Sequence, residues 1–164
     1  MVRSYDEMRR KLENELNGVN AKIEGWEKVV IKKKKDGSEY KRMTKACVEN
    51  ACFEGNSWRP QQKELSISTY TEGLGYKSDI ITVSIYNDES FKTLAPGEIR
   101  VMIRNKVKEL KEERDSIQEA IKVSKEYYDN LYNAIFEVRK IYEKSQEYSR
   151  LYNALREAAS NYYF

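Results

Sequence analysis

Apolar residues recur every three or four positions over the first thirty residues of the chain. This spacing places them on one face of an α-helix and, from Leu12 onward, along the seam of a packed helix pair. Ser4 and Glu7 form a capping-box pattern, in which each side chain satisfies a backbone amide of the other residue. Because Gly18 and Gly25 weaken a helix, we expect it to run from about residue 4 to about residue 25. The apolar positions are Tyr5, Leu12, Leu16, Val19, Ile23, Trp26 and Val30.

After this helix the pattern changes to short runs in which apolar and polar residues alternate. Alternation with a period of two is typical of strands that bury one face. It is clear in residues 65–69 and 81–86, with a glycine-marked turn between them. A second hairpin is predicted around Asp36 and Gly37, since Asp-Gly between β-compatible runs favours a type I′ turn. Two hairpins over about residues 28–87 are enough for a small antiparallel sheet with one covered face.

Helical spacing returns at Pro96, a residue that suits the first turn of a helix. The stripe changes register near its end, so we expect a turn near Ser124 or Ser145 and two or three helices over about residues 96–163. The stripe contains Ile99, Ile103, Val107, Leu110, Ile117, Ile121, Tyr128, Leu131, Ile135, Val138 and Tyr142, and then Tyr148, Leu151, Leu155, Ala158 and Tyr162.

These patterns predict one α+β domain over residues 1–164. A small antiparallel sheet of two hairpins is flanked by an N-terminal helix and by long C-terminal helices with coiled-coil-like packing. The chain is 40% hydrophobic and 35% charged, which suits helices that are solvated on one face. No apolar run approaches the roughly 18 residues of a membrane span, and the N-terminus has no signal-peptide core. We therefore expect a cytoplasmic protein without a membrane span.

The chain has no histidine, which removes the commonest general base near neutral pH and every Ser-His or Cys-His nucleophile pair. We expect a protein that is not an enzyme. Its two cysteines, Cys47 and Cys52, are expected to be buried as small apolar residues. A closed zinc site would need carboxylates to complete it, so neither a metal nor a cofactor is predicted.

The sharpest feature is a basic segment at residues 28–45, where eight lysines and arginines oppose two acidic residues. The local charge of +6 exceeds the +3 of the whole chain and is typical of a phosphate-binding surface. Lysines that prevent edge-to-edge pairing of a sheet are the alternative interpretation. The predicted binding residues are Lys32, Lys33, Lys34, Lys35, Lys41, Arg42 and Lys45, with Tyr40 able to stack on a base and with Trp58 and Arg59 as exposed-loop anchors.

Together these features predict a non-enzymatic binding protein. The chain is rich in Lys, Asn, Tyr, Ile and Glu, which A/T-rich codons encode. This composition indicates an A/T-rich bacterial, phage or mobile-element genome. The leading hypothesis is a phage-type inhibitor that binds a host protein, such as a nucleic-acid-handling defence complex, in the manner of an anti-CRISPR protein. The alternatives are direct nucleic-acid binding through the basic hairpin and a structural coiled coil that forms homo-oligomers.

Overall fold

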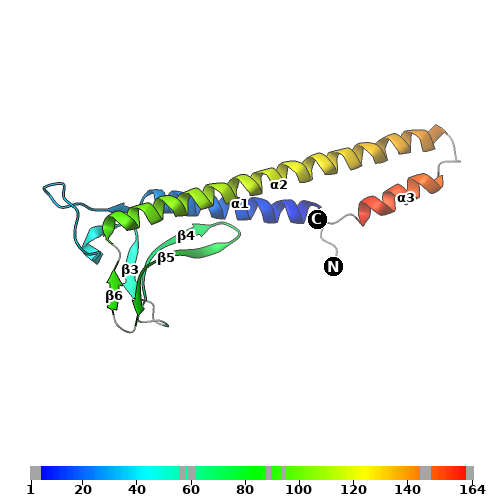
Figure 1. The fold of residues 1–164 in the computed structure, drawn as a ribbon. Coiled ribbons are helices and arrows are strands. Elements are labelled where there is room, and N and C mark those ends of the chain that lie inside the picture. Colours follow the sequence, from blue (N-terminus) through cyan, green and yellow to red (C-terminus); the bar gives the residue numbers. More distant parts are fainter. Residues whose placement is uncertain are drawn as a thin grey trace. The chain divides into compact units, whose positions relative to one another are not determined.

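The computed structural model describes residues 5–55, 58, 62–87, 90–93, 95–144 and 149–161. The chain has the predicted α+β fold, with helices and antiparallel strands (Figure 1). Its contacts divide it into a sheet unit, Asn14–Asp115, and a helical unit formed by Met1–Glu13 and Ser116–Phe164. That the whole chain is one domain stays a prediction. The helices of the described residues are α1 (Tyr5–Glu27), α2 (Pro96–Lys144) and α3 (Ser149–Ser160).

The sheet unit contains a four-stranded antiparallel sheet with the strand order β3-β4-β5-β6. Its strands are β3 (Cys52–Gly55), β4 (Gln62–Thr71), β5 (Gly75–Asn87) and β6 (Ser90–Thr93). The hairpin of β4 and β5 confirms the predicted alternation, since Leu65, Ile67, Ile81 and Val83 are all buried. Gly73, at φ 88°, allows the tight turn between the two strands. The sequence analysis did not predict the short strands β3 and β6.

The hairpin predicted around Asp36 and Gly37 forms only at its base, where two strands of two residues pair antiparallel. Residues 32–44 contain no strand and connect β1 (Val30–Ile31) to β2 (Val48–Glu49) through a long loop that ends in a 3₁₀ turn, η1 (Lys45–Cys47). Four consecutive lysines have no apolar side chain with which to cover a core, so extending the strands through them would gain no burial.

A tight turn does form at the Asp-Gly pair, although its type differs from the prediction. The Gly37 N–H donates to the carbonyl of Lys34 at 2.9 Å, and the Lys34 N–H donates to the carbonyl of Ser38 at 2.9 Å. A type I′ turn needs positive φ at both central residues. The Gly37–Lys34 hydrogen bond closes a turn whose central residues are Lys35 and Asp36, and neither is among the described residues with positive φ; Gly37, which follows them, has a φ of 84°. The turn is therefore not type I′.

Both helices of the sheet unit cover the same face of the sheet. Trp26 of α1 is fully buried, and its Nε1 donates to the Asp79 carboxylate of β5 at 2.6 Å. The ammonium of Lys106 in α2 lies 3.3 Å from the other oxygen of that carboxylate. One carboxylate thus connects two helices to the sheet. The buried residues of the two helices are Val19, Ile23 and Trp26 in α1 and Ile99, Ile103 and Leu110 in α2.

Gly18 and Gly25 of α1 face the β4–β5 hairpin, and the helix ends near the predicted residue 25. The helix continues past Gly25 to Glu27. A Cβ atom at Gly25 would lie 2.8 Å from Cδ1 of Ile67, and one at Gly18 would lie 2.7 Å from Cδ1 of Leu74. Since the two glycines are seven residues apart, they lie on one face of the helix. Their small size lets the backbone of α1 approach the hairpin at two points.

In the helical unit, α2 runs through Ser124 without the turn that the sequence analysis expected there. The Ser124 hydroxyl donates to the Ile121 carbonyl of the same helix at 2.9 Å, so this buried polar group is satisfied without a break. Helix α2 ends at Lys144, and the second expected break, Ser145, lies outside the described residues.

An aromatic stack joins the first turn of α1 to α2 within the helical unit. The rings of Tyr5 and Tyr128 are nearly parallel, with centroids 4.1 Å apart. Partial burial raises the pKa of the Tyr5 phenol, because it disfavours the charged form. Among the described residues, no helix is long and apolar enough to cross a membrane.

We expect Gly25→Ala to destabilise the protein and Gly18→Ala to leave its stability unchanged or raise it. Alanine gains up to about 1 kcal/mol of helix propensity at either position, whereas overpacking against buried Ile67 costs about 1–3 kcal/mol. At position 18 the new methyl group meets only the end of the half-buried Leu74 side chain, which can turn away. Urea denaturation measures both free energies of unfolding. Equal values for the two variants would contradict the idea that buried Ile67 cannot turn away from the new methyl group whereas half-buried Leu74 can.

We expect Asp79→Ala to lower the free energy of unfolding by about 2–4 kcal/mol, since it leaves a buried indole N–H and a lysine without their partner. Asp79→Asn keeps an acceptor for the Trp26 indole, so its free energy of unfolding should fall clearly less than that of Asp79→Ala. Chemical denaturation measures the stabilities, and the indole proton resonance of Trp26 reports the hydrogen bond. An Asn variant no more stable than the Ala variant would show that the hydrogen bond contributes little.

Candidate partner-binding site

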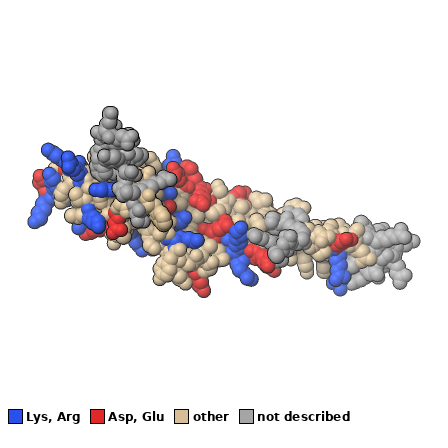
Figure 2. All heavy atoms as spheres, turned by 90° about the horizontal axis from the view of Figure 1, so that it is seen from below, with Lys and Arg blue, Asp and Glu red and all other residues tan. Residues whose placement is uncertain are grey.

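The predicted basic residues lie on one exposed segment, residues 32–45, which we call the basic loop. Every residue of the loop is exposed except Met43, which is buried. Lys and Arg atoms gather at the left of Figure 2, where Figure 1 draws this loop. The loop contains the predicted binding residues Lys32, Lys33, Lys34, Lys35, Tyr40, Lys41, Arg42 and Lys45.

Carboxylates already compensate three of these cations. The pairs, measured from Nζ to the carboxylate oxygen, are Lys32 with Glu49 at 2.8 Å, Lys33 with Glu39 at 3.8 Å and Lys45 with Glu54 at 3.7 Å. The hydrogen bond that the Lys32 ammonium donates to the Glu49 carboxylate raises the pKa of Lys32. Within the described part of the chain, the other four have no acidic partner: Lys34, Lys35, Lys41 and Arg42.

Lys45 pairs with Glu54 of the edge strand β3, so edge protection, the alternative interpretation of the basic segment, stays a prediction. No residue of the loop itself lies in a strand. The charge lies instead on a loop that is fixed at both ends and open to solvent between them.

Arg100 of α2 fixes the start of the basic loop. Its guanidinium donates to the carbonyl of Ile31 at 2.7 Å and to the carboxylate of Glu39. At the other end Met43 and Cys47 are buried, and the Lys32 N–H donates to the carbonyl of Cys47 at 2.7 Å. The loop therefore has a defined position relative to the first turns of α2.

The turn of the basic loop is held by Asp36. Its carboxylate accepts hydrogen bonds from the backbone N–H of Ser38 at 2.9 Å and from the Ser38 hydroxyl at 2.5 Å. These bonds favour the ionised form and lower the pKa of the Asp36 carboxyl. Asp36 is exposed, so its role is local: it shapes the loop that presents the cations.

The other predicted site residues fall in the connection between β3 and β4. Trp58 is 92% exposed, which confirms that it lies in an exposed loop. Arg59 lies outside the described residues. Cys47 is buried as expected, but the same expectation for Cys52 is wrong. Strand β3 turns Phe53 into the core, so its neighbour Cys52 points to the opposite, open face.

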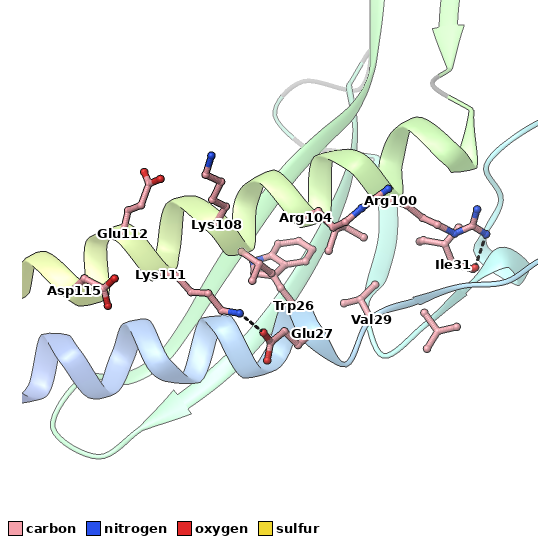
Figure 3. Close-up of a pocket in the computed structure, with 13 residues that line it drawn as sticks. Trp26, Glu27, Val29, Ile31, Arg100, Arg104, Lys108, Lys111, Glu112 and Asp115 are labelled. Carbon is pink, nitrogen blue, oxygen red and sulfur yellow. Dashed lines mark hydrogen bonds and ion pairs between the residues drawn. The ribbon is translucent and has the colours of Figure 1, made fainter.

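The sequence analysis missed a groove of about 800 Å³ that lies beside the basic loop, between the end of α1, β1 and α2. We call it the α1–α2 groove (Figure 3). It combines an apolar floor with a charged rim, and all of it belongs to the sheet unit. The floor consists of Trp26, Val29, Val30, Ile31, Ile103 and Val107, and the rim of Glu27, Arg100, Arg104, Lys108, Lys111, Glu112 and Asp115.

Most rim charges have partners, and two do not. Lys111 reaches across the groove to Glu27 at 2.9 Å, as Figure 3 shows. Arg104 and Lys108 are exposed and have no acidic partner among the described residues. A basic spacing of four, four and three from Arg100 to Lys111 was present in the sequence. That these residues line a groove could be seen only in the structure, where β1 lies beside α2.

The open face of the sheet carries a second feature that the sequence analysis did not single out. Tyr70 and Tyr76 stand opposite each other on β4 and β5, with ring centroids 5.0 Å apart and both rings exposed. The next pair on this face is Ser68 opposite Ser78. Tyrosine and serine side chains suit contact with a protein, since they combine apolar area with adaptable hydrogen bonding.

Comparison of the chain with protein-family models, with curated proteins and with solved structures gives no match. In the part of the chain that the structure describes, no three His, Cys, Asp or Glu side chains are grouped so that they could hold a metal ion. The chemistry that these surfaces offer is charge and apolar contact.

We expect Ser38→Ala to raise the pKa of Asp36 towards its ordinary value, because both a hydroxyl donor and a well-formed turn are lost. In the wild type the ionised Asp36 carboxylate stabilises the turn fully at a pH above the ordinary pKa of an aspartate. This contribution is lost as the pH falls through the lowered pKa of Asp36 in the folded protein. An NMR titration of the Asp36 carboxyl measures the shift. Ser38→Thr, which keeps the hydroxyl, is the control, and an unchanged midpoint in the alanine variant would exclude the hydroxyl as the cause.

Proposed function

We propose that this chain is a non-enzymatic binding protein that engages an acidic surface of a protein partner through its basic loop. One observation carries the proposal: four cations without an acidic partner in the described structure lie on an exposed loop that belongs to no strand. A partner's carboxylates would complete ion pairs there and guide its approach.

The mixed character of the surface favours a protein over a nucleic acid. Binding to phosphates gains affinity from each free cation, but carboxylates already occupy Lys32, Lys33 and Lys45. The loop also begins directly after Ile31, which lines the apolar floor of the α1–α2 groove. Apolar area bordered by charges of both signs is typical of protein–protein interfaces.

The proposed setting of this partner is a host nucleic-acid-handling complex, which the chain would inhibit as phage anti-defence proteins do. Its enrichment in residues that A/T-rich codons encode and its lack of histidine support this setting. Inhibition would follow from occupying the partner's surface and would need no catalytic group.

Direct nucleic-acid binding is the second candidate, and one contact favours it. The ammonium of Lys34 lies 5.9 Å from the centroid of the exposed Tyr40 ring. A cation beside an exposed aromatic ring can bind a phosphate while the ring stacks on a base. This candidate predicts affinity that falls steeply with salt.

We expect a photo-crosslinker at position 46 to capture one discrete protein from a nuclease-treated extract of a bacterium with an A/T-rich genome. Ala46 suits this purpose because it is small, uncharged, exposed and adjacent to the loop. Excess unlabelled wild-type protein should abolish the product. A charge-reversed competitor should be at least roughly tenfold weaker, because it repels the acidic partner; its substitutions are Lys34→Glu, Lys35→Glu, Lys41→Glu and Arg42→Glu.

The control competitor reverses four exposed cations of the helical unit and should compete like the wild type. Its substitutions are Arg10→Glu, Lys11→Glu, Lys122→Glu and Lys125→Glu. Equal competition by both variants would contradict the role of the loop. Fluorescence anisotropy with single-stranded DNA, duplex DNA and RNA runs in parallel at two salt concentrations. Tight, salt-sensitive binding that the loop variant loses would replace the protein partner with a nucleic acid.

A further inference from the structure

The α1–α2 groove has the composition of a docking site for a helix. We propose that it binds an amphipathic helix of the partner whose apolar face is flanked by acidic residues. This proposal rests on the proposed function in that the partner is a protein, but it concerns residues outside the basic loop.

The floor of the groove offers apolar area on a rigid base. Val30 is 45% exposed, and Val29 and Val107 are partly exposed beside it. Trp26 and Ile103 are buried beneath them and cannot move aside without disturbing the core. Apolar side chains of a partner would remove the exposed part of this floor from water, which is the driving force of helix-in-groove recognition.

The length of the groove suits about four helical turns. Its lining residues on α2 extend from Arg100 to Asp115, which at 1.5 Å per residue corresponds to about 22 Å. A helix of about 15 residues laid along α2 would cover it. Such a helix presents apolar residues at positions three and four apart, as a narrow groove requires.

The unpaired charges of the groove determine which charge the flanks of the docked helix must carry. Arg100 is bound to Glu39, Lys111 to Glu27, and Asp115 to Arg114. Arg104 and Lys108 have no acidic partner in the described structure and are four residues apart, so they lie one turn apart on one face of α2. Carboxylates with the same spacing on a docked helix would face both cations. A basic flank would be repelled.

A second copy of the chain fits the groove less well than an acidic helix. In a two-fold symmetric contact through this groove, the same patch of both copies meets itself. The rim carboxylates of the other copy are already engaged, Glu27 by Lys111 and Asp115 by Arg114, so they offer no unpaired acceptor to Arg104 and Lys108. Charge complementarity therefore points to a different, acidic chain.

Fluorescence anisotropy with synthetic 15-residue helical peptides tests the proposal on the full chain. The acidic probe has Leu at positions three and four apart and Glu along the flanks, the basic probe has Lys in place of Glu, and the polar probe has Gln in place of Leu. We expect the acidic probe to bind at least roughly tenfold more tightly than either of the others.

A charge-swap variant identifies the two cations. Arg104→Glu with Lys108→Glu should weaken binding of the acidic probe by roughly tenfold and create binding of the basic probe. Lys122→Glu with Lys125→Glu makes the same change in net charge on exposed residues of α2 outside the groove and should alter neither. Val30→Asp should weaken binding of the acidic probe, because it places a negative charge on the exposed part of the apolar floor, and circular dichroism shows whether the variant is folded.

The outcomes separate this inference from the proposed function. The charge-reversed loop variant should still bind the acidic probe, so a failed probe assay beside a successful crosslink would overturn the groove alone. Equal binding of the acidic and basic probes, or a charge swap without effect, would overturn it as well. So would sedimentation that shows a concentration-dependent dimer which Val30→Asp dissociates, because the occupant would then be a second copy.

Discussion

The hydrogen bond from Trp26 to Asp79 is the contact on which the rest of the sheet unit depends. A fully buried indole N–H must have an acceptor, and the carboxylate that provides it also binds Lys106 of α2. One side chain of β5 thus fixes the last turn of α1 and an early turn of α2 against the same face of the sheet. The chain leaves α1 only two residues later and enters β1 at Val30. Both candidate binding surfaces therefore begin at a point that this contact sets.

One helix face then connects the two surfaces. Arg100, in the first turns of α2, holds the start of the basic loop through Ile31 and Glu39, and the next two turns of the same face present Arg104 and Lys108 to the groove. A partner that fills the groove would thus lie beside the loop. The apolar floor supplies the non-directional part of such binding, and the free cations supply its direction.

The elements that sequence reasoning predicted well are those whose periodicity is local. In β4 and β5 apolar and polar residues alternate, and in α1 and α2 apolar residues recur every three or four positions. Both patterns follow from the burial of one face and can be recognised from residues close together in the sequence. The errors arose where tertiary contacts overruled a local rule. Gly18 and Gly25 indicate a weak helix in isolation but serve a close contact in the fold. Asp36-Gly37 forms a turn, but the strands β1 and β2 do not extend to it, because the lysines beside the turn have no apolar face to bury.

The sequence by itself determined the number and clustering of the cations, the absence of histidine chemistry and the amphipathic faces of the helices, since these depend on residue type and short-range spacing. Only the tertiary structure decided which cations remain free. Lys32 is compensated by Glu49 and Glu39 by Arg100, and these partners are brought together by the path of the loop and by the position of α2. The groove likewise exists only where β1 meets α2. Ion pairs and cavities join residues far apart in the chain, and no local pattern specifies the path that brings them together.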